Sequence, residues 1–576
     1  MKLLIGVVLV GFVCGALATG AWAQGPASSP AGAALTSKTV YAKDKPPATP
    51  RLEDLPLKDS VSQYGITWTF EKPVPVGQFL NGDWYVVGPV TVSAIDPSPR
   101  YGKDVADGEL DAYEKGSVKE GQRLRNGSML NPPARQEVAY DSGIKNWFRP
   151  DQAARLPIRM KPGDSLVSTI SLKVGEKVET PYTGQRPRAL NTFVRAEADN
   201  SSVRTAAILT CMGEPQPPDA FRPAYCDTKN TVYLARDMKR QLLKNLPRPD
   251  GCCRGEGTSS KRHPPHDPPR LENLPKMDTW VRVFQRPWVN TGFFGFDQPM
   301  ENMPHYEQWI GQAMSMAGLM LMLDFPPDEK EPLLVNVVQV GIDYWGAVRG
   351  GHPGWDGHGG HGSGRKFPIV FAGLLLGDEE MAAPTKAFPK VDFGEDDQTA
   401  YGDCWTGAKV VFAGHSGIHA DGSVPRPKWG PYEHMHPSKW RNEGDRMNMQ
   451  SEGYRRANTS SSWPGQALVI RMLGAEKHWN HDAFFDYVDR WMYEDDKAFR
   501  QEINKHFPEY PSSKFLTSEA DVWYHQGQAW EPFVTDMWLK YRTAPGMPPT
   551  DGWKQKHDDS VYRSAVEKMK PAPKTQ

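Results

Sequence analysis

The sequence predicts a multidomain α and β protein, in which an N-terminal β-sandwich-like domain is followed by a helical domain. Its 576 residues are enough for at least two domains of about 100–200 residues each. Residues 58–245 contain short β-branched and aromatic runs separated by turn residues, a pattern typical of a sandwich. Residues 278–545 instead contain long apolar segments separated by Gly-rich loops, which predicts packed helical hairpins.

Strands and helices are expected at definite places in these regions. In residues 58–245 we predict strands at Asp83–Val92 (interrupted by Gly88-Pro89), Ser165–Val174, Ala206–Cys211 and Thr231–Leu234. In residues 278–545 we predict helices at His305–Leu323, Glu331–Val348, Phe367–Leu376, Ala467–Leu473 and Ala483–Phe499. The third of these helices is apolar almost all round, so we expect it to be buried on most sides.

The N-terminus has the features of a secretory signal peptide, which we place at residues 1–23. Lys2 gives a positive charge, an apolar run extends from Leu3 to Leu17, and Ala21-Trp22-Ala23 fits a cleavage site. The apolar run is short for the alternative, a transmembrane anchor. No later segment has the roughly 18 uninterrupted apolar residues of a membrane span. We therefore expect a secreted or periplasmic protein with no membrane attachment after cleavage.

Other segments outside the domains are predicted from composition. Residues 24–57 are rich in Pro, Ala, Ser and Lys and are predicted to be a linker, and residues 246–277 form a Pro-rich linker between the domains. Residues 546–576 are rich in Pro and Lys and are predicted to be a frayed tail.

Of the six cysteines, Cys14 lies in the predicted signal peptide, so an odd number remains. An oxidising compartment favours a disulfide between Cys211 and Cys226, or one from this pair to Cys252 or Cys253. Cys252-Cys253 lacks the C-x-x-C spacing of a redox or zinc site, which favours a structural role.

Composition limits the classes of partner. The charges of 68 Lys and Arg against 69 Asp and Glu give a net charge of −1, which argues against a nucleic-acid-binding protein because such proteins usually carry a basic excess. The 19 Trp are consistent either with a large core or with flat platforms for a sugar ligand.

Polar side chains concentrate in a Gly-rich loop at residues 350–366, between two apolar helices. The loop contains His352, His358, His361, Trp355 and Arg365. Glycines let the backbone adopt positive φ and approach a ligand closely, and no Gly-Lys-Ser/Thr of a P-loop follows them. The alternative is a flexible loop with solvated histidines, but the Trp and the abrupt return to a buried helix favour a functional role.

Further candidate segments are also rich in polar and aromatic residues. Residues 426–441 contain Tyr432, which can exchange protons, and Arg426, which can neutralise a carboxylate; an aromatic packing loop is the alternative. Residues 286–306 contain Asn290 and Asn302, which could bind a carboxylate or cap a helix. Residues 454–463 precede an apolar helix and could be either surface or substrate subsite.

Other kinds of catalytic machinery are disfavoured. The motif around Ser416 lacks the second glycine of a serine-hydrolase elbow, and no H-E-x-x-H occurs. The pairs His358-x-x-His361 and His434-x-His436 could contribute to a zinc site, but each is weak alone. We therefore expect no cofactor, with a metal as the open alternative.

The chain resembles the (α/α)-toroid polysaccharide lyases, which include alginate, glucuronan and heparinase-like lyases. The resemblance covers mainly residues 280–540 and rests on the Gly-His-Gly-Ser-Gly-Arg-Lys loop at 360–366 and the Tyr-Glu-His-Met-His-Pro loop at 432–437. Here the β-rich region comes first, whereas in many such lyases the toroid precedes its β-sandwich. The resemblance implies an (α/α) toroid or incomplete barrel at 278–545, acting on an anionic uronate polysaccharide.

The resemblance also implies the reaction, a β-elimination in which a carboxylate is neutralised, a base removes the C5 proton and an acid protonates the leaving O4. Carried over, Asn302 (or Asn290) and Arg426 neutralise the carboxylate. His361 (or His358) is the base for anti elimination, and Tyr432 is the acid, or both base and acid for syn elimination. The implied substrate-binding residues are Asn290, Trp288, Trp355, Arg365, Trp405, Trp429, His434, His436 and Arg455.

Different functions remain open from the sequence. A toroidal glycoside hydrolase needs paired carboxylates across the glycosidic bond, for which Asp343, Asp356, Asp403 and Glu433 are available without forming an evident pair. A non-catalytic glycan-binding protein is the other alternative, which the density of proton-transfer residues in Gly-rich loops disfavours.

Overall fold

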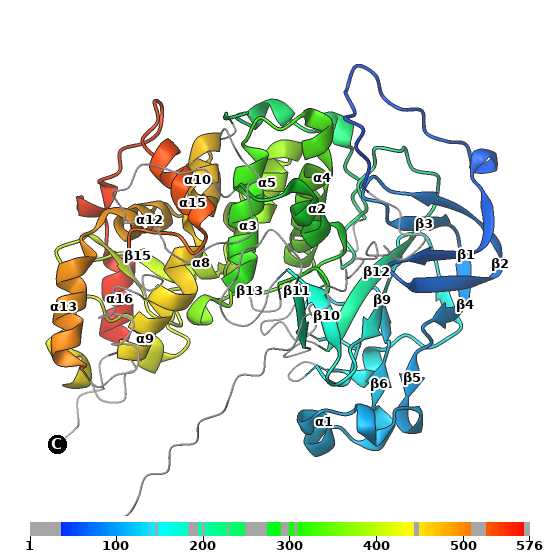
Figure 1. Ribbon diagram of the computed structural model, residues 1–576, viewed down its shortest axis with the longest axis horizontal. Coiled ribbons are helices and arrows are strands. Elements are labelled where there is room, and N and C mark those ends of the chain that lie inside the picture. The colour runs from blue at the N-terminus through cyan, green and yellow to red at the C-terminus, as the bar shows by residue number, and fades with distance from the viewer. Residues whose placement is uncertain are drawn as a thin grey trace, which may run out of the picture.

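The computed structural model describes residues 36–135, 137–144, 148–181, 194–197, 202–226, 230–247, 274–289, 299–304, 308–442, 448–508 and 526–569. It consists of an N-terminal β-rich region and a helical C-terminal region that lie side by side (Figure 1). The predicted signal peptide, Cys252 and Cys253 lie outside the described residues.

The β-rich region is built on one sheet in which the long strand β2 (Ile66–Gln78) joins two groups of strands. It pairs with β1 (Leu57–Gln63) between Ile66 and Pro75, with β4 (Val90–Asp96) near its beginning, and with β3 (Trp84–Val87) at its end. The order of the path is β7-β9-β12-β3-β2-β4-β8, with β7 at Ser128–Leu130, β8 at Ile158–Met160, β9 at Ser165–Ser171 and β12 at Val203–Met212. Within this path β12 and β3 run parallel.

The two faces of this sheet belong to different hydrophobic clusters. On β12, Leu209 packs into a cluster with Trp68 and Leu166 inside the curled sheet, whereas its neighbour Ile208 joins the core shared with the helices. Successive residues of a strand point to opposite faces, so the alternation buries both sides. The predicted β-rich region is therefore confirmed, but as one hydrogen-bonded curled sheet rather than two separate sheets.

Short strands complete the described β structure. They are β5 (Arg100–Tyr101), β6 (Leu124–Arg125), β10 (Lys177–Thr180), β11 (Val194–Glu197), β13 (Gly354–Trp355), β14 (Asp392–Phe393), β15 (Thr399–Tyr401) and β16 (Val410–Phe412). The last four lie within the helical region.

Helices dominate the chain after residue 277. They are α2 (Met277–Gln285), α3 (Gln308–Leu321), α4 (Pro327–Arg349), α5 (Lys366–Leu376), α6 (Glu379–Ala382), α7 (Pro384–Ala387), α8 (Gly394–Asp397), α9 (Asn448–Tyr454), α10 (Pro464–Leu473), α11 (Glu476–Trp479), α12 (Asp482–Tyr493), α13 (Asp496–His506), α15 (Pro532–Tyr541) and α16 (Ser560–Lys568); α1 (Ala112–Ser117) lies in the β-rich region. The long apolar helices agree with the prediction from hydrophobic spacing.

Local sequence explains where the central helices begin, end and touch. Pro327 begins α4 at a position where no backbone N–H is needed, and Gly377 ends α5 in the left-handed conformation. A Cβ on Gly341 would lie 2.2 Å from the carbonyl oxygen of Pro368, so α4 and α5 pack with their backbones in close approach.

The β-rich and helical regions are joined by a buried ion pair network. Arg222 donates to Asp83 Oδ2 at 2.6 Å, beside β3, and to both carboxylate oxygens of Asp343 on α4, at 3.0 and 2.6 Å. All three side chains are buried. In the segment predicted to be a linker, Thr36 donates to Asn336 of α4 at 2.8 Å, so this part of the chain also lies against the helices.

Several expectations about the fold were wrong. Residues 231–234 form no strand but only an isolated bridge between Ala220 and Leu234. The segment Ala483–Phe499 contains two helices, α12 and α13, because Asp495 caps the second by accepting from the N–H of Lys497.

The expected tail and disulfide also differ from the structure. The predicted frayed tail contains α16, whose Tyr562 and Ala565 are buried in the core. Cys211 and Cys226 are separate buried thiols rather than a disulfide.

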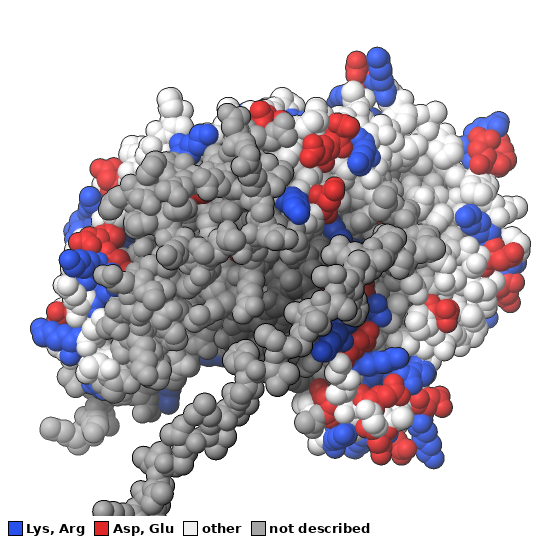
Figure 2. Space-filling model, viewed as in Figure 1, with Lys and Arg blue, Asp and Glu red and all other residues white. Residues whose placement is uncertain are grey.

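Charged side chains of both signs lie mainly near the edges of the face drawn in Figure 2. On the face drawn in Figure 2, acidic and basic side chains alternate, and both signs gather on the projection that carries α1, β5 and β6. None of the described helices is long and apolar enough to cross a membrane.

The Arg222→Met variant is expected to lower the free energy of unfolding by about 3–5 kcal/mol, because Asp83 and Asp343 would stay buried without their cation. Denaturant unfolding followed by circular dichroism measures this loss. Arg51→Met is the control, since Arg51 pairs with Asp54 at the surface, where an ion pair contributes little. Equal, small losses in both variants would contradict the role assigned to Arg222.

Candidate functional site

The Gly-rich loop at 350–366 and the loop at 426–441 meet at a pair of side chains. The guanidinium of Arg426 lies 3.0 Å from Nε2 of His358, and the ring of His358 lies 5.6 Å from that of His361 between centroids. Arg426 is exposed, and both histidines are partly exposed. Because an arginine only donates hydrogen bonds, Nε2 of His358 accepts, and its lone pair points toward Arg426.

A third histidine and two aromatic rings complete this group. The ring of His415 lies 5.1 Å from that of His358, 4.0 Å from that of Trp429 and 4.4 Å from that of Tyr454. Tyr454 is partly exposed and ends α9 where a π-helix (Arg455–Thr459) begins; such irregular turns are frequent at functional sites. We call His358, His361, His415, Arg426, Trp429 and Tyr454 the histidine cluster.

Backbone geometry at the Gly-rich loop makes this close approach feasible. Gly359 has a φ of 68°, and a Cβ there would lie 2.5 Å from Nε2 of His415 and 3.0 Å from a ring carbon of Tyr454. The N–H of Gly359 also donates to the carbonyl of His415 at 2.8 Å. Next to it, His358 has a φ of 29°, a left-handed conformation that is uncommon for residues other than glycine.

The environment keeps two of these histidines neutral. Burial, with the positive charge of Arg426 and the neighbouring His361, lowers the pKa of His358 to about 4. Burial and the adjacent His358 and His361 lower the pKa of His415 to about 2. Near neutral pH both rings are therefore unprotonated, which is the state in which a histidine accepts a proton.

Tyr432 does not belong to this cluster. Its hydroxyl is buried and donates to Glu452 Oε2 at 2.6 Å, and burial together with Glu452 raises its pKa well above the usual value. The expectation that Tyr432 is the acid was therefore wrong, because its proton is held inside the protein. Tyr454, from the candidate segment at 454–463, instead places its ring beside the histidines.

Asn302 does not belong to the cluster either. Asn302 is buried, and its Nδ2 donates to the carbonyls of Val283 and Arg286, at 3.1 and 3.2 Å. It therefore fixes the end of α2 rather than facing a substrate, which corrects the role expected for it. Asn290 lies outside the described residues.

The tryptophans expected to be sugar platforms divide into two groups. Trp288 and Trp355 are each 1% exposed; Trp288 stacks on Phe284 and Trp355 on His352, so both belong to the core. Trp429 lies in the histidine cluster, and Trp405 is partly exposed beside His436. The prediction was therefore wrong for Trp288 and Trp355.

The remaining expected subsite residues lie behind or away from the cluster. Arg365 is buried and donates to the carbonyls of His361 and Ser363, at 3.0 and 2.9 Å, so it shapes the Gly-rich loop from within. Arg455 is fully buried. His434 is partly buried, with Nδ1 3.1 Å from the hydroxyl of Tyr562 on α16.

A buried network of ion pairs includes Arg455, the residue that follows Tyr454 in the sequence. Arg455 donates to both oxygens of Glu452 at 2.9 and 3.1 Å, and its Nε lies 3.5 Å from Glu433. Arg490 of α12 donates to Glu433 at 2.6 Å, and Arg456 donates to Asp496 of α13 at 2.8 Å. This network, which we call the Glu452 network, fixes the backbone on both sides of Tyr454.

The carboxylates considered for a hydrolase are dispersed. Asp343 is paired with Arg222 and Glu433 with Arg490, all in the interior. Asp403 pairs with Lys409 at the surface. Asp356 lies 3.8 Å from His419. Asp343 and Glu433 are therefore enclosed in the protein and neutralised by arginine, which does not suit the pair of carboxyl groups that flanks the glycosidic bond in a hydrolase.

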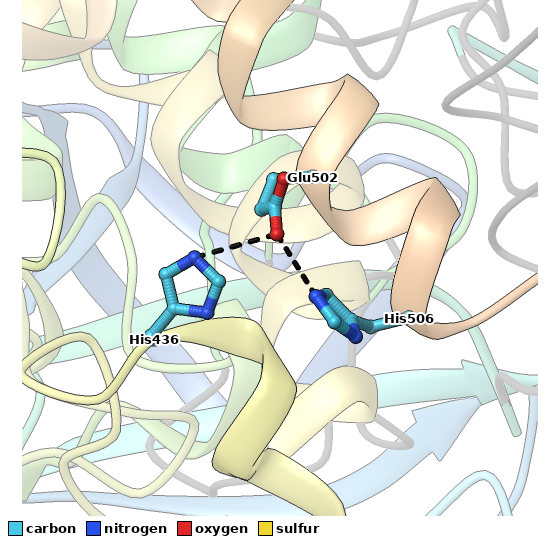
Figure 3. A group of neighbouring side chains, drawn as sticks. All are labelled: His436, Glu502 and His506. Carbon is cyan, nitrogen blue, oxygen red and sulfur yellow. Dashed lines mark hydrogen bonds and ion pairs between the residues drawn. The ribbon is translucent and has the colours of Figure 1, made fainter.

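The histidine that sequence reasoning missed is His415. It stands between Gly414 and Ser416, a motif considered only as a serine-hydrolase elbow. The signal in the sequence is the glycine on either side, Gly414 and Gly417; in the structure both adopt positive φ and lie in close contact with other segments of the chain. Among the described residues, the group with metal-ligating geometry is a separate one, His436, Glu502 and His506 (Figure 3).

The Gly359→Ala variant is expected to lower the free energy of unfolding by about 1–3 kcal/mol, because the new Cβ collides with His415. Thermal or denaturant unfolding measures the change. The matched control is Gly351→Ala, since Gly351 also has a positive φ, of 93°, but a Cβ there meets nothing within 4 Å. A loss no larger at Gly359 than at Gly351 would refute the close approach.

The stability contributed by His415 should decline as pH falls below about 6.5, the usual pKa of a solvent-exposed histidine, whereas buried carboxyls with raised pKa values, such as Asp141 and Glu395, act in the opposite direction. Because its pKa in the folded state is about 2, His415 takes up a proton only on unfolding, so its stabilisation is complete above pH of about 6.5 and declines below it. The slope from His415 is at most about 1.4 kcal/mol per pH unit. Between neutral and mildly acidic pH, the free energy of unfolding of the parent should fall relative to that of His415→Gln as pH is lowered, and the same pH dependence in both proteins would contradict the assignment.

Comparison of the chain with protein-family models, with curated proteins and with solved structures gave no match in any of the three. The role of the histidine cluster is therefore inferred from its own geometry and chemistry.

Proposed function

We propose that the protein is a lyase that cleaves a uronic-acid-containing polysaccharide by β-elimination at the histidine cluster. The observation that carries the proposal is the contact between His358 Nε2 and Arg426 at 3.0 Å. In a uronate, the acidic C5 proton sits on the carbon that bears the carboxylate. The base and the group that neutralises the carboxylate must therefore be immediate neighbours, as His358 and Arg426 are.

The first half of the reaction uses this pair. When the substrate carboxylate binds Arg426, the negative charge that develops on C5 and its carboxylate is stabilised by the guanidinium. The lone pair of His358 Nε2, no longer engaged by Arg426, accepts the C5 proton. The lowered pKa of His358, about 4, keeps this nitrogen unprotonated near neutral pH. Part of the lowering comes from the charge of Arg426, so a substrate carboxylate bound to Arg426 raises this pKa toward the range that suits a general base.

The second half of the reaction releases the leaving sugar. The electron pair from the C5–H bond forms the C4–C5 double bond while the C4–O4 bond breaks, and Tyr454 gives its hydroxyl proton to O4. His361 lies next to His358 on the same loop, where it can bind the substrate or return protons. Trp429, partly exposed beside Tyr454 at 5.9 Å between ring centroids, offers an apolar face for a sugar ring.

The proposal includes an incomplete (α/α) toroid as the architecture of the helical region. Supporting it, α4 packs against the next long helix, α5, and against α2, while α10 packs against α12 and α15 and against the distant α3, so the helices form one packed layer. Loops between such helices carry all members of the histidine cluster except Tyr454, which ends α9.

The test is incubation with alginate, glucuronan and glycosaminoglycans. We expect unsaturated products that absorb in the ultraviolet, and activity reduced at least about 100-fold in His358→Gln and Tyr454→Phe, the usual size of a general acid–base contribution. Arg426→Lys should mainly raise KM. The controls are His478→Gln and Tyr493→Phe, at partly exposed positions away from the cluster.

The alternatives give different results in the same assay. New reducing ends without an ultraviolet chromophore would favour a hydrolase. Binding without turnover that survives His358→Gln would favour a glycan-binding protein. No absorbance gain with any of the polymers would overturn the proposal.

A further inference from the structure

We propose that His436, Glu502 and His506 form a binding site for a divalent transition-metal ion of the zinc class. The site is separate from the histidine cluster and does not depend on the proposed elimination. His436 lies in the loop before a 3₁₀ helix (Pro437–Asn442), and Glu502 and His506 lie on α13. Figure 3 shows both imidazoles turned toward the carboxylate of Glu502.

The spacing of the ligands along the chain favours convergence. Glu502 and His506 are four residues apart on α13, so they lie on the same face of the helix. The third ligand comes from a distant loop, at residue 436, which α13 packs against. Two ligands on one helix and one from a distant segment, all of His and Glu type, match the His₂Glu set of open zinc sites.

Distances fit a tetrahedral ion. Nitrogen and oxygen ligands of zinc lie about 2.0–2.2 Å from the ion, which places ligand atoms about 3.4 Å apart around a tetrahedron. Oε1 of Glu502 lies 3.4 Å from Nε2 of His436 and 2.9 Å from Nε2 of His506. All three ligand atoms lie within 4.8 Å of one another, so small side-chain rotations bring them to the expected separation.

Surrounding contacts orient the ligands. Nδ1 of His436 accepts a hydrogen bond from the backbone N–H of Ser438 at 3.3 Å and lies 2.9 Å from Oγ of the same residue, and these contacts hold the ring with Nε2 facing Glu502. When an ion binds Nε2, the imidazole proton moves to Nδ1, where Oγ of Ser438 is the acceptor. Arg441 donates to the backbone carbonyl of His506 at 3.0 Å, which ties the loop to the end of α13. The rings of Trp405 and His436 also pack in a T-shaped contact, with 5.0 Å between their centroids.

The ion would retain an open coordination position. The side chains of His436, Glu502 and His506 are 40%, 25% and 26% exposed, so water can supply the fourth ligand. Lys505 lies 3.3 Å from Glu502 but is itself exposed, and it can turn into solvent when the ion binds. The bound ion would fasten the loop at 434–442 to α13.

The experiment uses the full chain, stripped of metal by a chelator and then titrated with Zn²⁺ in a calorimeter and with Co²⁺ in a spectrophotometer. We expect one ion per chain, a visible absorption band of tetrahedral Co²⁺, and a melting temperature several degrees higher with Zn²⁺. His506→Gln and His436→Gln should each weaken binding at least tenfold. One variant changes the helix and the other changes the loop, so weaker binding in both cannot be explained by damage to only one of these segments.

The matched control is His478→Gln. His478 lies 3.7 Å from Glu379, so this variant removes a histidine that is also paired with a glutamate but is not part of the three-ligand group. Binding should be unchanged in this control. The proposal is overturned if the parent protein binds neither ion, or if His436→Gln and His506→Gln bind as tightly as the parent.

Discussion

The Glu452 network is the interaction on which the arrangement of the candidate site depends. Glu452 and Arg455 lie in the interior with no exposed surface, where each charge is tolerated only because it is paired and hydrogen-bonded. Through Glu433, Arg490 and Asp496 the network joins the loop after β16, α12 and α13. Tyr454, next in sequence to Arg455, is thereby held at the end of α9 with its ring against His415.

The Glu452 network also gives Tyr432 and Tyr454 different surroundings. Tyr432 and Tyr454 both lie close to Glu452, one by contact and one in sequence. Only Tyr432 donates its hydroxyl proton in a hydrogen bond to the carboxylate, so that it acts as a structural donor. The hydrogen bonds described for Glu452 come from Tyr432, Arg455 and Arg456 and not from Tyr454, which is why the proposed reaction assigns the leaving-group proton to Tyr454.

The sequence was sufficient to predict the long helices and to single out the loops of the candidate site, but not to predict which way their side chains point. The apolar spacing of α4 and α5 has few alternatives, and the glycines around His358 and His361 indicate close backbone approach. In contrast, Tyr432 and Tyr454 both occur in polar, aromatic segments, and only the tertiary position of Glu452 and Arg455 separates them. Trp355 and Trp429 likewise cannot be separated from the sequence, because a tryptophan in a loop can turn either into the core or toward solvent. His415 could not be assigned to the cluster because its position there depends on contact with His358, in a distant segment of the chain.

The curled sheet has a consequence for how the molecule can be divided. Its outer face supplies Met129, Val167 and Ile208 to the same core that contains Trp309 and Leu333 of the helices, and Arg222 closes the junction. Removing the strands of this sheet would expose the shared apolar surface to water. The β-rich region therefore cannot be removed as an independent domain. A truncated protein that contains the helices alone would lack the strand residues that cover one side of its hydrophobic core.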